Sequence, residues 1–91
     1  MSKPIRCVKL IGGEVVMGFF SENKLGTEII IEEARECIVD IIEGRMEVQL
    51  APWLPFAKDH IFKIRKSSVI TVFEARPNLE TNYKVSTGNR K

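Results

Sequence analysis

Apolar and polar residues alternate in several runs of this chain, such as residues 6–10 and 46–50, with the period of two that is typical of β-strands. Two clusters of turn-forming residues, Gly12-Gly13 and Glu43-Gly44-Arg45, separate neighbouring runs and predict hairpin turns, the first with a two-residue loop. The spacing indicates an all-β chain of five or six short strands, folded as a strongly bent antiparallel sheet or small open barrel. Apolar runs with strand character lie within residues 6–10, 16–20, 28–42, 46–50, 60–65 and 69–73.

Three of these runs are apolar at successive positions and therefore apolar on both faces: Ile29–Ile31, Ile38–Ile42 and Val69–Phe73. A small antiparallel sheet with one wet face would alternate instead. The sheet must therefore curl until both faces are covered, or another subunit must cover the excess. Because an uncovered apolar edge promotes aggregation, we expect an oligomer joined by strand pairing. The predicted interface strand consists of Val69, Ile70, Thr71, Val72 and Phe73.

The chain divides into one β domain, residues 1–76, followed by a short helix and a polar tail. Pro77 suits the first turn of a helix, and Leu79 and Tyr83 are four residues apart, so we predict a helix over residues 77–85. Residues 86–91 are polar and are predicted to be a disordered tail.

Two further features interrupt the strand pattern. Gly18 lies inside the second run, where a glycine predicts a bend or a close backbone approach. The segment Pro52–Phe56 holds two prolines, which cannot both donate hydrogen bonds in a central strand, so it is an edge, bulge or loop. Its aromatic residues leave two alternatives: Trp53 packs over the barrel end of its own subunit, or the loop binds a partner. The candidate partner-binding residues are Trp53, Leu54 and Phe56.

Composition places the chain among ordinary single-domain globular proteins. It has 91 residues, of which 44% are hydrophobic and 29% charged, and its net charge is +2. This charge is unevenly distributed, because residues 1–13 and 58–91 are basic whereas residues 14–47 are acidic. No apolar run is long enough for a membrane-spanning helix or a signal peptide, so we predict a cytoplasmic protein with no membrane partner.

The chemistry available to the chain argues against catalysis. It has one histidine, His60, and no recognisable catalytic motif, so we predict that it is not an enzyme and needs neither cofactor nor metal. Cys7 and Cys37 lie in apolar runs and are predicted to be buried free thiols. The acidic residues Glu32, Glu33 and Glu36 are interpreted as the solvated residues of a loop. The segment 65–68 is basic and hydroxylated, and such a loop can either hold phosphate or be a solvated turn.

Two segments resemble the motifs of Sm-like proteins, the Lsm and Hfq superfamily. Residues 8–20, with a glycine turn between two apolar strands and Gly18 inside the second, resemble the first motif, which continues to Ile29 and Ile31. Residues 64–69 resemble the second motif, whose usual form is Ile-Arg-Gly, a polar pair and valine. Ala51–Phe56 is also similar to a segment of small Sm-like proteins of tailed phages of marine bacteria, which suggests a phage-encoded chain acting in a bacterial host.

The resemblance implies a strongly bent five-stranded antiparallel sheet that assembles into rings of six or seven subunits. Strand four of one subunit pairs with strand five of the next, and single-stranded RNA lies at the central pore. The loop after strand two and the loop between strands four and five hold this RNA. The corresponding residues of this chain are Asn23, Lys24, Arg65, Lys66, Ser67 and Ser68.

The chain departs from the family pattern at the positions that read the RNA base. Lys24 and Glu28 stand where the first motif usually has an aspartate and an asparagine, and Lys66 replaces the glycine of the second motif. A ring of Glu28 side chains would repel phosphate. Two functions follow: an RNA-binding ring, or an oligomeric adaptor that meets another protein through the Trp53 loop and the acidic stretch 28–47.

Overall fold

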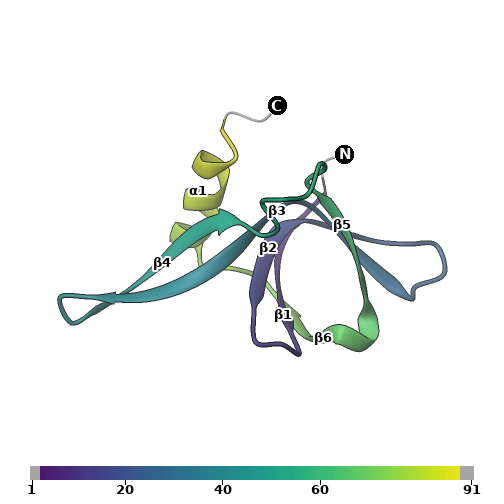
Figure 1. Ribbon diagram of the computed structural model, residues 1–91, viewed down its shortest axis with the longest axis horizontal. Coiled ribbons are helices and arrows are strands. Elements are labelled where there is room, and N and C mark those ends of the chain that lie inside the picture. The colour runs from purple at the N-terminus through teal and green to yellow at the C-terminus, as the bar shows by residue number, and fades with distance from the viewer. Residues whose placement is uncertain (1–2, 89–91) are drawn as a thin grey trace.

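The computed structural model describes residues 3–88. Within this range the chain forms an antiparallel sheet of six strands with one α-helix at its C-terminal end (Figure 1). The elements are β1 (Ile5–Leu10), β2 (Val15–Glu22), β3 (Glu28–Ile42), β4 (Arg45–Pro52), β5 (Ile61–Arg65), the 3-10 turn η1 (Lys66–Ser68), β6 (Val69–Phe73) and α1 (Pro77–Ser86).

The strands follow the order β4-β3-β2-β1-β6, and β5 pairs with the first part of β3. This arrangement bends the sheet into an open barrel in which β5 and β6 follow each other in sequence through η1 without pairing. The predicted fold class, a strongly bent antiparallel sheet with a short C-terminal helix, is confirmed. The sheet has six strands rather than five because the loop 53–60 separates β4 from β5.

The longest strand, β3, corrects one prediction. Glu32, Glu33 and Glu36 were interpreted as solvated residues around a loop, but they lie within a single strand of 15 residues. The strand turns at Glu33, whose φ of 55° is left-handed, and Glu33 N–H donates to the carbonyl of His60 at 2.7 Å. One residue in this conformation redirects a strand without ending it, and a glutamate there gives no glycine signal in the sequence.

Gly18 marks a close approach between β2 and β3, as predicted. A Cβ atom at this position would lie 2.5 Å from Cγ2 of Ile31 and 2.6 Å from the carbonyl oxygen of Glu32. The pairing register of β2 with β3 shifts at the same point, between Met17 and Phe19. The sheet therefore bends where glycine allows the two backbones to meet.

The two hairpin turns differ from each other. The predicted two-residue loop at Gly12-Gly13 is wrong, because Leu10 N–H donates to the Glu14 carbonyl at 2.9 Å and encloses three residues. Gly13, with a φ of +103°, has the conformation that such a loop requires. The turn predicted at Glu43-Gly44-Arg45 is present, but it has two residues, Glu43 and Gly44, both at positive φ, and Arg45 is the first residue of β4.

Two apolar clusters fill the structure. The first lies inside the bent sheet, and Trp53 and Phe62 pack against it. The second lies between the sheet and α1 and joins Cys7, Met17 and Tyr83. The buried members of the first cluster are Val8, Leu10, Val16, Ile29, Ile31, Ala34 and Ile64.

Both cysteines are free thiols at the second cluster. Cys7 is buried, whereas Cys37 is only half-buried, which corrects the prediction that both are buried. A hydrogen bond with Cys7 and, secondarily, burial raise the pKa of the Cys37 thiol well above its ordinary value. The same hydrogen bond lowers the pKa of the Cys7 thiol, but Cys7 is completely buried. A protonated thiol is a poor nucleophile and a buried thiol is inaccessible to reagents in solution, so neither residue has the features of a reactive cysteine.

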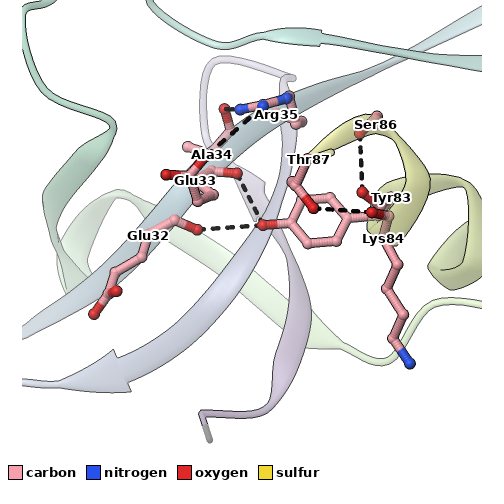
Figure 2. A network of polar contacts seen from close by, with 8 residues as sticks. All are labelled: Glu32, Glu33, Ala34, Arg35, Tyr83, Lys84, Ser86 and Thr87. Carbon is pink, nitrogen blue, oxygen red and sulfur yellow. Dashed lines mark hydrogen bonds and ion pairs between the residues drawn. The ribbon is translucent and has the colours of Figure 1, made fainter. Parts of the chain in front are cut away.

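Helix α1 is anchored to the bend of β3 by Tyr83, which is completely buried (Figure 2). Its hydroxyl donates to the carbonyl oxygen of Glu33 at 2.9 Å and lies 3.3 Å from that of Glu32. Its ring packs edge-on against Phe19, with centroids 5.7 Å apart. Ser86, assigned to the tail in the sequence prediction, is the last helical residue, and residues 89–91 of that tail lie outside the described part of the chain.

The second half of β3 and most of β4 form a hairpin, residues 38–49, which we call the arm. It projects from the barrel at the left of Figure 1, and each of its residues is exposed. Residues 46–50 were predicted to form a half-buried strand; the strand is present, but the Met46 side chain is 73% exposed. The alternation is real, but in the described part of the chain no other element covers the apolar face of the arm.

Candidate nucleic-acid interface

Two loops that are distant in sequence lie side by side at the end of the barrel opposite the arm. The loop 23–27 joins β2 to β3, and η1 joins β5 to β6. Lys66 N–H donates to the carbonyl of Thr27 at 3.0 Å, and Arg65 is the cross-strand partner of Glu28. The fold therefore brings together the six residues that the resemblance placed at an RNA site: Asn23, Lys24, Arg65, Lys66, Ser67 and Ser68.

Asn23 shapes the loop 23–27. Its Oδ1 accepts hydrogen bonds from the backbone N–H groups of Thr27 at 3.0 Å and Glu28 at 2.9 Å. Its Nδ2 lies 3.1 Å from Oγ1 of Thr27, so both ends of the amide are engaged. Lys24 and Leu25 are consequently held at the exposed end of the loop. A contact between Asn23 and RNA stays a prediction.

Acidic side chains offset the cations of this site. Nζ of Lys66 lies 3.3 Å from Oε1 of Glu22, and both side chains are nearly half exposed. Glu28 stands directly opposite Arg65 on the neighbouring strand. An exposed pair of this kind is weak and is screened further by salt, so a phosphate group can compete for the Lys66 ammonium.

The serines of η1 have different surroundings. Ser67 is exposed, whereas Ser68 is half-buried and its carbonyl accepts a hydrogen bond from Ile11 N–H at 3.0 Å. The turn between β1 and β2 is thus hydrogen-bonded to η1. The backbone that presents Arg65 and Lys66 is fixed on both sides, by Thr27 and by Ile11.

Two open strand edges adjoin the basic loops. In the part of the chain that the structure describes, β6 pairs only with β1, and β5 pairs only with β3. The predicted interface strand is largely exposed, with Ile70 61% and Phe73 41% accessible. On β5, Ile61 is also exposed. Both edges present unpaired backbone groups next to apolar side chains, which is the arrangement that favours pairing with another chain.

The proline-rich loop divides into a packed and an exposed part. Trp53 is half-buried and meets Phe62 edge-on, with ring centroids 5.3 Å apart, so the tryptophan packs within its own subunit. Leu54 and Phe56 point outward, and Phe56 is 98% exposed. A partner contact through this loop stays a prediction, and these two side chains are the ones available for it.

Sequence reasoning missed two contributors to this architecture. Glu22 was not identified as the partner of Lys66, because 44 positions separate them and no spacing rule connects them. Tyr83 was expected on a helix but not as the residue that binds the bend of β3. Within residues 3–88, no group of three metal-ligating side chains is present, and no helix is both long and apolar enough to cross a membrane.

Comparison of the sequence with protein-family models and with curated proteins finds no match. Among solved structures, the fold is similar to that of a heptameric archaeal Sm protein, which is discussed in relation to the eukaryotic snRNP core. The two chains share 18% identity and a TM-score of 0.47, over 79% of this chain and 85% of the archaeal one. A likeness of this size carries no argument about function. Fold class therefore rests on the strand pairings described above, and function on the residues of the site.

Proposed function

We propose that this chain forms a ring by pairing β5 of one copy with β6 of the next, and that the ring binds single-stranded RNA at the loops 23–27 and 65–68. The observation that carries the proposal is the position of Lys24, Arg65 and Lys66 beside the two open strand edges. Because β5 and β6 flank η1 directly, any assembly through these edges repeats the three cations once per subunit around a common axis.

The edges suit each other in chemistry. β5 and β6 each have five residues, and both expose apolar side chains, among them Ile61, Ile70 and Val72. Pairing would satisfy the outward backbone groups and would cover these side chains at the same time. Heterologous contacts of this kind close into rings when the rotation between copies allows it. The family resemblance suggests six or seven copies.

Assembly is tested with Thr71→Pro, which removes a backbone donor from β6 and distorts the strand. Sedimentation should give a multiple of the 10.4 kDa chain mass for the wild type and a smaller particle for the variant. The matched substitution is Lys58→Pro in the exposed loop 53–60, where the backbone N–H of Lys58 donates no hydrogen bond within the described residues. A wild-type mass near that of one chain at micromolar concentration would refute the ring.

RNA binding is tested by fluorescence anisotropy with labelled single-stranded oligouridylate and oligoadenylate. Lys66→Ala should weaken binding, whereas Lys84→Ala, which removes an equal charge from α1, should not. The logarithm of affinity should fall linearly with the logarithm of salt concentration, with a slope of about −0.7 per phosphate contact. Absence of binding at low salt, in the wild type and in Glu28→Gln alike, would contradict the RNA function.

A second candidate function, an oligomeric adaptor for another protein, is favoured by one observation. Phe56 is almost completely exposed in the same loop as Leu54, and this loop is attached to the barrel by the contact between Trp53 and Phe62. Large exposed aromatic side chains are typical anchors at protein interfaces. If RNA binding fails while the ring forms, Phe56→Ala becomes the variant with which to test this alternative.

A further inference from the structure

The arm has one continuous apolar face that no other element within residues 3–88 covers. Val39 pairs with Val48, and Ile41 pairs with Met46, so the four side chains lie on the same face of the hairpin. All four are exposed, and Ile41 is 74% accessible. A hairpin of two strands is marginally stable in water by itself, and additional strands stabilise it, so the arm is suited to pairing with further strands.

The opposite face of the arm carries an unfavourable pair of charges. Asp40 and Glu47 are direct cross-strand partners, and like charges in this position destabilise a sheet. Among residues 3–88, no cation forms an ion pair with either carboxylate. Arg45, the cation nearest in sequence, stands opposite Ile42 instead. A cation supplied from outside the subunit would relieve this repulsion.

The outer edge of β4 is open along the arm, since β4 pairs only with β3 in the described chain. The two-residue turn makes Ile42 and Arg45 the hydrogen-bonded closing pair of the hairpin. Hydrogen-bonding direction alternates along a strand, so the backbone N–H and C=O groups of Met46 and Val48 point away from β3. These groups are available to a further strand.

We propose that the arm is a self-association surface on which β4 strands of two copies pair antiparallel about a two-fold axis at Met46. In this register Arg45 of each copy lies opposite Glu47 of the second copy. Two opposite-charge pairs form, and each brings a guanidinium group to the face where Asp40 and Glu47 repel each other. The partner is therefore a second copy of this chain, selected by charge.

Other registers lack this complementarity. An axis at Val48 would place Arg45 opposite Ala51, and an axis at Glu47 would place the two Glu47 carboxylates against each other. The axis at Met46 is also compatible with the outward backbone groups, because both copies then exchange hydrogen bonds at Met46.

Edge-to-edge pairing places the apolar faces of the two arms on the same side of one four-stranded sheet. The four apolar side chains of the arm expose roughly 400–500 Å² per copy, within the range of patches that are often functional. Because side chains of neighbouring antiparallel strands contact each other, the Met46 side chains of the two copies would pack side by side at the axis. A groove of about 590 Å³ between β4 and α1, with Leu79 and Arg76 on its far side, offers room for side chains of the second copy.

A charge swap tests the pairing. Arg45→Glu brings two carboxylates together at each cross-strand pair, and Glu47→Arg brings two guanidinium groups together. Each variant should halve the mass measured by sedimentation, and the double variant Arg45→Glu/Glu47→Arg should regain the wild-type mass. Lys58→Glu, an equal charge change in the loop 53–60, is the matched control and should leave the mass unchanged. Circular dichroism verifies that each variant is folded.

Unchanged mass in both single variants, or failure of the double variant to regain the mass, would overturn the proposal and leave the arm to a different protein partner. Cross-linking gives a second measurement. Met46→Cys should form a disulfide across the axis, because Cα atoms of such a pair lie about 5.5 Å apart, within the range of a disulfide. Glu47→Cys should not form a disulfide, because in this register Glu47 lies opposite Arg45 of the second copy and not opposite the second Glu47. Absence of a Met46→Cys dimer would also overturn the proposal.

The arm and the ring use different strands, so their failures are distinguishable. Thr71→Pro should reduce the size of the assembly because it disrupts β6. When Arg45→Glu is added to Thr71→Pro, the mass measured by sedimentation should still fall by a factor of two. If the ring does not form, the same factor of two appears as a dimer that becomes a monomer.

Discussion

Removal of the Tyr83 hydroxyl provides the most direct test of how the bent strand is held. In Tyr83→Phe the ring stays in its buried position against Phe19, but the carbonyl of Glu33 loses a hydrogen bond of 2.9 Å. A hydrogen bond contributes about 1 kcal/mol net, and a buried acceptor that loses its donor costs about 1–3 kcal/mol. Because a carbonyl oxygen has a second lone pair, we expect Tyr83→Phe to lower the free energy of unfolding by about 1–2 kcal/mol.

Urea denaturation at a single protein concentration measures this effect, since assembly makes stability depend on concentration. Tyr83→Ala, which also removes a completely buried ring, should cost about 3–5 kcal/mol. Ser86→Ala removes a hydroxyl that donates to the carbonyl of Tyr83 at the exposed end of α1, and it should change stability by less than about 0.5 kcal/mol. A Tyr83→Phe protein as stable as the wild type would refute the anchoring role of the hydroxyl.

Further predictions concern the barrel and the candidate site. Gly18→Ala should destabilise the fold by about 1–3 kcal/mol in urea denaturation, because the new methyl group would overlap Ile31 and the β3 backbone; a stable variant would contradict the close approach. Glu28→Gln should strengthen binding of single-stranded RNA, most clearly at low salt, and anisotropy titrations that show no change would argue against an electrostatic role for Glu28. Trp53 should emit at shorter wavelength than free tryptophan, because Phe62 and the barrel core cover one face of it; emission like that of the free amino acid would show that it is exposed.

The elements that depend on local patterns were predictable from the sequence. Alternation identified the strands, and Pro77 identified the start of α1 at the correct residue. Gly18 was predicted to mark a close approach, because the absence of a side chain inside a strand has few other physical causes. The two basic residues 65–66 were placed beside the loop 23–27 through a family resemblance, and the hydrogen bond from Lys66 to Thr27 agrees with that placement.

The features that depend on tertiary contacts were not predictable in the same way. Glu33 adopts positive φ because the surrounding sheet holds it there, and its side chain gives no local signal for this conformation. The burial of the arm was overestimated because alternation reports which residues share a face and not whether another element covers that face. Met46 and Val48 follow the pattern of a half-buried strand, yet both are exposed in the single chain.

The bend at Glu33 also explains how one strand can serve two surfaces. Before the bend, β3 pairs with β5 and supports the loops that carry Arg65 and Lys66; after it, β3 pairs with β4 and forms the arm. These surfaces lie at opposite ends of β3 (Figure 1). Substitutions that are well separated and share no partner have nearly additive effects. Variants at Arg45 should therefore leave RNA affinity per site unchanged, and variants at Lys66 should leave arm pairing unchanged. Tyr83 is the exception, because it holds the bend itself, so its loss should weaken both surfaces together.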